Sequence, residues 1–190
     1  MLGLMLTTML AVPDGYTEGK SRDGCTVHIG AKAPSGIAKV YLECIWSDLT
    51  VAKLDGLLGD IGIHDDIFPS IAESDVLSTN AGVIRAKQRH VNAGISDREV
   101  IHLHGRAEKG GGIQHWWRKD KSQDGVSGDN VEPDKSNGYW LLESEGTGVR
   151  VGYALQYEPG GSVPGFVISA FQTAGVLDFV TALGAYARAN

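Results

Sequence analysis

The sequence predicts an α+β fold in which a curved antiparallel β-sheet wraps around a long C-terminal helix and encloses a hydrophobic cavity. Strand-like patterns cluster in the middle of the chain, whereas a parallel α/β protein would alternate them with helices. The stretch Pro164 to Ala187 has Asp178 as its only formally charged residue. A helix that is apolar on nearly every side must be covered by protein or by lipid, and a curved sheet is the simplest cover.

Composition limits the size and the partners of the protein. The chain has 190 residues, of which 42% are hydrophobic, and this is enough for one domain with a core or a core and a cavity. There are 17 Lys and Arg residues against 23 Asp and Glu residues, giving a net charge of −6. Because nucleic-acid binding depends on cationic side chains that neutralise phosphates, we expect no nucleic-acid partner.

The first twelve residues, Met1 to Val12, form an apolar leader with two interpretations. The leader has the length of the apolar region of a signal peptide, although no Lys or Arg precedes it. If it is the remnant of such a signal, the protein is periplasmic or secreted. If it is a first helix, the protein is cytoplasmic. In either case we expect residues 13–190 to form one domain.

The first strand pair is predicted around the turn sequence Ala33-Pro34-Ser35-Gly36. If the hairpin centres between Pro34 and Ser35, Cys25 and Cys44 face each other directly and a disulfide is sterically possible. Such a bond persists only in an oxidising compartment. The alternative is two free thiols that pack as small apolar side chains.

A short amphipathic helix over Thr50 to Ile61 should follow, with Asp48 or Thr50 as its N-cap. Six further strands are expected around Glu73–Leu77, Val83–Val91, Arg98–His104, Ile113–Arg118, Gly138–Glu143 and Val149–Glu158. Most of their separators are short turn signals, which predicts an antiparallel meander. The one long separator, Lys119 to Asn137, is polar and predicts a mobile loop at the rim.

Three segments resemble one known family in the expected order. They are Asn92-Ala93-Gly94-Ile95-Ser96-Asp97-Arg98-Glu99-Val100, the segment Pro69 to Leu77, and the segment Tyr153 to Ala170. The stretch from about Gly15 to the C-terminus resembles the START lipid-transfer domains of the Bet v 1-like helix-grip superfamily. Two features depart from the family pattern: its opening N-terminal helix is short or missing, and its usual Trp is absent near His64 to Phe68.

The resemblance implies a tunnel that holds one hydrophobic ligand of the lipid or sterol class. The closing helix and the loop Val91 to Asp97 would open it, with transient membrane contact. Such domains carry or sense their ligand, rarely catalyse, and need no cofactor, and we expect a monomer of the bacterial single-domain type. The alternative is a cyclase- or aromatase-type enzyme that uses His102, His104 or Tyr153 for acid–base chemistry in the same cavity.

Apolar side chains on the predicted strands and on the closing helix are candidates for the cavity wall. They are Trp117, Tyr139, Tyr153, Leu155, Val167 and Phe171. The alternative for each of them is ordinary core packing.

Polar candidates come from the alternation of the strands. Arg98, His102 and His104 share one strand face. By its resemblance to sterol-binding members, the chain places Arg85 and His104 where those members have a cavity-facing charged pair. Since both would be cationic here, either His104 stays neutral or an anion joins them, from Asp178 or from an acidic ligand. The alternative places Arg85 on the outer face, because one bulge would reverse the register.

Other chemistries find little support. The pair His102-x-His104 could bind a metal with His115 as third ligand, but no carboxylate or cysteine spacing completes a set, and we expect no metal. The run Gly110-Gly111-Gly112 opens no helix and predicts no nucleotide site. A C-terminal membrane span over Phe166 to Ala187 would carry polar residues that are costly in lipid, so we expect the helix to pack on the sheet.

Overall fold

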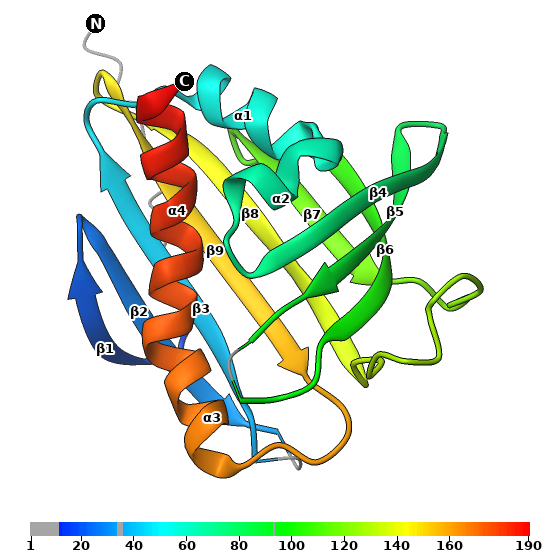
Figure 1. The fold of residues 1–190 in the computed structure, drawn as a ribbon. Helices are drawn as coiled ribbons and strands as arrows, with labels where there is room; N and C mark the ends of the chain where they lie inside the picture. The colour runs from blue at the N-terminus through cyan, green and yellow to red at the C-terminus, as the bar shows by residue number, and fades with distance from the viewer. Residues whose placement is uncertain (1–11, 34–35, 93) are drawn as a thin grey trace, which may run out of the picture.

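The computed structural model describes residues 12–33, 36–92 and 94–190 (Figure 1). All but the last residue of the predicted leader Met1 to Val12 therefore lies outside the described residues. The turn residues Pro34 and Ser35, and Ala93 in the loop after the fifth strand, lie outside them as well.

The described chain forms a nine-stranded antiparallel sheet with the strand order β1-β2-β3-β9-β8-β7-β6-β5-β4. The sheet curves around the closing helix, with the shorter helices at one end (Figure 1). This confirms the predicted α+β fold class. The strands are β1 Thr17–Arg22, β2 Cys25–Lys32, β3 Ala38–Trp46, β4 Ile71–Asn80, β5 Val83–His90, β6 Arg98–Lys109, β7 Gly112–Lys119, β8 Lys135–Glu145 and β9 Gly148–Glu158.

The strands differ from the predicted ones chiefly at the edge of the sheet and at their ends. Strand β1 was not predicted, because all six of its residues are exposed and its sequence shows no apolar alternation. Strand β4 runs on to Asn80 and β6 to Lys109, and the last residues of both strands are exposed. Backbone pairing extends these strands beyond the part that buries side chains.

The predicted amphipathic helix is α1, Val51–Gly59, and Thr50 is its N-cap, since the Thr50 hydroxyl accepts from Lys53 N at 3.3 Å. The helix ends before the predicted Ile61. A 3₁₀ turn, Ile61–Ile63, and a one-turn helix α2, His64–Ile67, follow it, and neither was predicted. These turns bury Ile61, His64 and Ile67.

The closing helix runs without a break through α3 Gly165–Ala170, a π-helical segment Phe171–Gly175 and α4 Val176–Ala189. It lies in front of β2, β3 and β9 (Figure 1). An 18-residue window of this 25-residue helix has a mean hydropathy of 1.6, so by length and composition alone the helix could cross a membrane. Packing on the sheet covers one face of its second half, whereas no residue of α3 is buried. The buried residues of α4 are Val176, Leu177, Val180, Leu183, Gly184 and Ala187.

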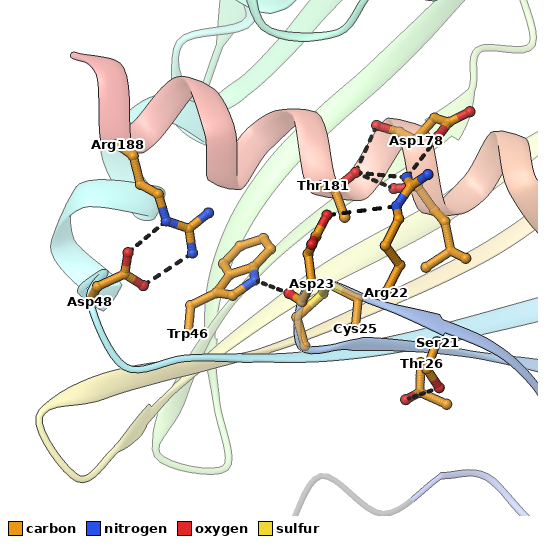
Figure 2. The surroundings of a disulfide bond; sticks show 12 residues. Ser21, Arg22, Asp23, Cys25, Thr26, Trp46, Asp48, Asp178, Thr181 and Arg188 are labelled. Carbon is orange, nitrogen blue, oxygen red and sulfur yellow. Dashed lines mark hydrogen bonds and ion pairs between the residues drawn. A yellow bond between two sulfur atoms is a disulfide. The ribbon is translucent and has the colours of Figure 1, made fainter.

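Cys25 lies opposite Cys44 in the β2–β3 register, and the structure joins them by a disulfide with a Cα–Cα distance of 4.0 Å (Figure 2). Both residues belong to the hydrophobic core. The same end of the sheet is tied to the closing helix by two ion pairs, Arg22 with Asp178 and Arg188 with Asp48 (Figure 2).

Reduction of the disulfide is expected to lower the free energy of unfolding by about 3 kcal/mol, because it releases a loop of roughly 20 residues in the unfolded chain. Urea unfolding with and without dithiothreitol measures the change. The double variant Cys25→Ala, Cys44→Ala serves as control and should not respond to dithiothreitol. Equal stability of the oxidised and reduced protein would contradict the prediction.

Candidate functional site

A cavity of about 300 Å³ lies between the sheet, the turns around α2 and the closing helix. One part of its wall is aromatic. The rings of Phe68 and Phe179 stack with their centroids 4.2 Å apart, and those of Trp140 and Tyr153 are 4.4 Å apart. Aromatic rings packed together in this way give an apolar surface suited to a hydrophobic ligand.

Four of the six predicted wall residues line this cavity: Trp117, Tyr153, Leu155 and Phe171. Trp117 stacks on Tyr153 with the centroids 5.5 Å apart. Its indole lies over Gly138 on the neighbouring strand, where an added Cβ would be 2.2 Å from Cζ2 of Trp117. The absence of a side chain at Gly138 is therefore what lets this wall form.

The other two predicted wall residues lie elsewhere. Tyr139 precedes Trp140, which faces the cavity, so by strand alternation Tyr139 faces the outside of the sheet. There Lys109 Nζ lies 5.9 Å from its ring. Val167 lines a smaller pocket, which contains Ile95 and Phe171 as well and lies at the start of the closing helix.

The predicted charged pair of Arg85 and His104 is not formed. His104 lines the cavity, but Arg85 does not. The β5–β6 register runs without a bulge and pairs His104 with Ile84, so it is Ile84 that shares the inner face. Arg85 lies on the outer face, where its Nε donates to Asp120 Oδ2 at 2.7 Å. The outer-face alternative is correct.

Two further ligand candidates, Arg98 and Asp178, do not line the cavity. Their side chains instead bind other segments of the protein. Arg98 is only 2% exposed and donates to the backbone carbonyls of Ser96, Pro159 and Gly160. The carboxylate of Asp178 is 65% exposed at the edge of the closing helix and accepts from Arg22 at 2.7 Å (Figure 2). Neither a buried base nor a cavity cation accompanies Asp178.

The predicted rim loop was Lys119 to Asn137; its ends belong to β7 and β8, and the remaining segment 120–134 covers the outer face of β6. The carboxylate of Glu99 accepts from Ser127 N at 2.7 Å and from Asn130 Nδ2 at 2.9 Å. The Gln123 side-chain oxygen accepts from Ile101 N at 2.8 Å. These bonds explain how Glu99 and Ile101 are buried on the face opposite to the cavity.

A chain of hydrogen bonds that the sequence analysis missed crosses the polar part of the cavity wall. The Ser136 hydroxyl lies 2.8 Å from His102 Nε2, and His102 Nδ1 lies 3.2 Å from Gln88 Oε1. The Gln88 amide in turn donates to Ser74 Oγ at 3.0 Å, which donates to Ile61 O. Because Oε1 only accepts, the network assigns the proton of His102 to Nδ1, and Ser136 donates to Nε2. Gln88 could have been predicted as a cavity residue, because it shares a strand face with Ile84 and Ala86.

Five of the six histidines in the chain line this cavity: His64, His90, His102, His104 and His115. Burial disfavours the charged imidazolium and lowers the pKa of His64 and of His90 to about 4 and that of His104 to about 3. Burial lowers the pKa of His102 and of His115 too, although at His115 the hydrogen bond to Asp55 opposes this effect. The histidines of the cavity wall are therefore uncharged at neutral pH.

The histidines do not form a metal site of the kind weighed for His102, His104 and His115. His115 Nε2 is 2.8 Å from Asp55 Oδ1, and both nitrogens of His102 have protein partners. No group of three or more His, Cys, Asp or Glu side chains within the described parts of the chain is arranged to hold a metal ion.

Comparison with known proteins identifies the fold. No family model and no curated protein matches the sequence. Among solved structures, a STAR-related lipid transfer protein from Xanthomonas axonopodis superposes with a TM-score of 0.83 at 19% identity, covering 92% of this chain and 99% of that chain. Human StAR-related lipid transfer protein 5 gives a TM-score of 0.80 at 13% identity over 90% of this chain and 85% of the other.

A more distant structural neighbour is the ZhuI aromatase/cyclase from a Streptomyces species, with a TM-score of 0.57 at 12% identity, covering 79% of this chain and 93% of that chain. At these identities the likeness concerns the fold. The described chain has the helix-grip fold of START domains, as the three sequence segments indicated.

Proposed function

We propose that this START-fold domain binds one hydrophobic ligand of the lipid or sterol class in its cavity, as a carrier or a sensor. The observation that supports this is the cavity itself, which combines an aromatic wall with a few placed polar groups. Two structural neighbours are named as lipid transfer proteins. The ligand would be held between the curved sheet and the closing helix.

Catalysis of the aromatase or cyclase kind is the second candidate, favoured by the hydrogen bond between Ser136 and His102 and by the ZhuI neighbour. A general base works best when its pKa is close to the operating pH. The pKa of His104 is about 3, and burial places that of His102 well below its ordinary value. This mismatch favours binding over catalysis.

Native mass spectrometry of protein purified from its own host, followed by organic extraction of bound molecules, tests the proposal. We expect one hydrophobic molecule per chain. An empty protein that also takes up no lipid or sterol from vesicles would refute the carrier function, whereas conversion of the extracted molecule by fresh protein would establish the enzyme alternative.

The entrance is proposed at the start of the closing helix, next to the loop Val91 to Asp97. A smaller pocket there is lined by Asn92 and Ile95 of the loop and by Val167 and Ile168 of the helix. Phe166 is 77% exposed at the same place and could enter a membrane surface during exchange. Opening requires the first turns of the closing helix to leave the sheet.

One buried hydrogen bond holds this part of the helix: Gln172 Nε2 donates to Ala38 O at 2.8 Å. Gln172 lies in the π-helical segment, a geometry that often marks functional positions in helices. Gln172→Ala is expected to raise the rate of ligand dissociation about 10-fold, since a buried hydrogen bond contributes roughly 1 to 1.5 kcal/mol.

Transfer of a fluorescent sterol from protein to acceptor vesicles measures this rate. Thr173→Ala is the matched control, because the neighbouring Thr173 bonds only within its own helix. If both variants release the ligand at the same rate, the Gln172 bond does not hold the entrance closed.

The disulfide bears on the compartment of the protein. A bond between Cys25 and Cys44 persists in the periplasm or outside the cell and is rare in the cytoplasm. It supports export as the proposed role of the leader.

A further inference from the structure

The charge balance of the cavity wall limits what the cavity binds. Among the described lining residues, Arg106 is the only one with a permanent charge. Its guanidinium donates from Nε and Nη2 to the two oxygens of Asp55, at 2.8 and 3.0 Å. That charge is therefore already neutralised, and Arg85, the expected partner for an acidic ligand, lies on the outer face.

The histidines supply polarity without charge. His64 and His104 are more than nine-tenths buried and come from α2 and β6, and their ring centroids are 6.2 Å apart. Their environment holds few charges: Asp60 and Asp65 lie near His64, and His115 with its partner Asp55 lies near both rings. Among the lining residues that the structure describes, an anionic ligand group would find no free cation, and it would lose its hydration.

Three imidazole nitrogens of this group lack a protein partner. They are Nε2 of His64, His90 and His104, none of which has a hydrogen bond within the described residues. A buried polar atom without a partner typically costs 1 to 3 kcal/mol. A neutral imidazole nitrogen donates or accepts according to its tautomer, and a hydroxyl group can serve either need, whereas a carboxylate only accepts.

We propose that the polar wall around His64 and His104 recognises an uncharged hydroxyl group, so that the cavity takes a neutral amphiphile with an apolar body and not a fatty acid or a phospholipid. The apolar body would lie against the aromatic wall of Phe68, Trp140 and Phe179. This inference rests on the proposed binding function and narrows its ligand class.

Three probes of equal chain length test the selectivity: 1-tetradecanol, tetradecanoate and tetradecane, compared at pH 7.4 by displacement of a fluorescent apolar reporter. We expect the alcohol to bind at least 10-fold more tightly than either of the others. Equal or tighter binding of tetradecanoate would overturn the selectivity while leaving the carrier function standing. If none of the probes and no sterol binds the folded protein, the carrier function itself fails.

His104→Phe tests the residue assignment, since it keeps a ring and removes both nitrogens. It should weaken tetradecanol binding about 10-fold and leave tetradecane binding unchanged or stronger. His64→Phe provides a second variant if the first fails to fold by circular dichroism. The matched control is His28→Phe, because His28 is the one histidine outside the cavity and is equally buried. A similar loss in His28→Phe, or no loss in either cavity variant, would contradict the assignment.

Discussion

Acidification from pH 7 to pH 4 is expected to unfold the protein through its cavity histidines. The unfolded chain takes up protons near the ordinary histidine pKa of about 6.5. In the folded protein, burial keeps the pKa of His64 and of His90 at about 4 and that of His104 at about 3. Between these values the unfolded state binds more protons, so stability is fully present above pH 6.5 and falls as the pH approaches 4.

The expected loss of free energy of unfolding is large compared with the stability of an ordinary domain. A pKa difference of roughly 2.5 units corresponds to about 3 kcal/mol for each of His64 and His90. His104 adds at least as much, and the whole free energy of unfolding is typically 5 to 15 kcal/mol. Carboxylates such as Asp55, whose pKa is lowered chiefly by its hydrogen bond with Arg106, lose their contribution at still lower pH. The histidines therefore dominate the window between pH 6.5 and 4.

Urea unfolding followed by circular dichroism at half-unit pH steps measures this loss. His104→Phe should flatten the pH dependence, since it removes one titrating group from the cavity. His64→Phe should flatten it as well, because burial lowers the pKa of His64 in the same way. A constant free energy of unfolding from pH 6.5 to pH 4.5 would show that the cavity histidines are charged or solvated in the folded protein.

Features that follow a local pattern, such as strand alternation and helix caps, could be predicted from the sequence. Features that depend on the register between strands could not. Alternation identified the inner face of β6 with His102 and His104, and the cap at Thr50 was recognised from its side chain. Arg85 was misplaced because a single residue of strand offset decides between the inner and the outer face. Its true partner, Asp120, belongs to a loop whose path over β6 no local pattern indicates.

The polar wall of the cavity was predicted only at His102 and His104, and the rest of it was missed for a different reason. Its five histidines are spread from residue 64 to residue 115 and converge only when α2, β5, β6 and β7 pack together. Gln88 and Ser136 gain their role from the distances to His102, which strand pairing alone sets. Strand β1 was missed because it is an exposed edge strand, whose sequence has no hydrophobic pattern to detect.

Arg98→Met is expected to lower the free energy of unfolding by about 4 kcal/mol. The guanidinium is 2% exposed, and it donates to three backbone carbonyls, those of Ser96, Pro159 and Gly160. Removing it leaves these carbonyls without the donor, at a cost of roughly 1 to 3 kcal/mol for each one that stays buried. Arg98→Lys should recover little, because one ammonium cannot reproduce the planar fork that reaches all three.

Arg89→Met is the matched control for Arg98→Met. Arg89 forms ion pairs with Glu73 and Asp97 on the outer face, where such pairs contribute about 1 kcal/mol or less. Equal losses in the two variants, measured by urea unfolding, would show that the carbonyl contacts of Arg98 contribute little to stability.

The position of Arg98 links this stability to ligand exchange. Pro159 and Gly160 begin the segment that leads from β9 to the closing helix, and Ser96 belongs to the loop Val91 to Asp97 at the proposed entrance. The Arg98 side chain therefore binds the segments on both sides of that entrance to the start of β6. Below its unfolding midpoint, Arg98→Lys should then release a bound sterol faster than the parent protein. Arg150→Met should not, because the partners of Arg150 are Glu43 on β3 and Glu145 on β8 and neither belongs to the entrance loop. Equal release rates would place the opening motion elsewhere than between these two segments.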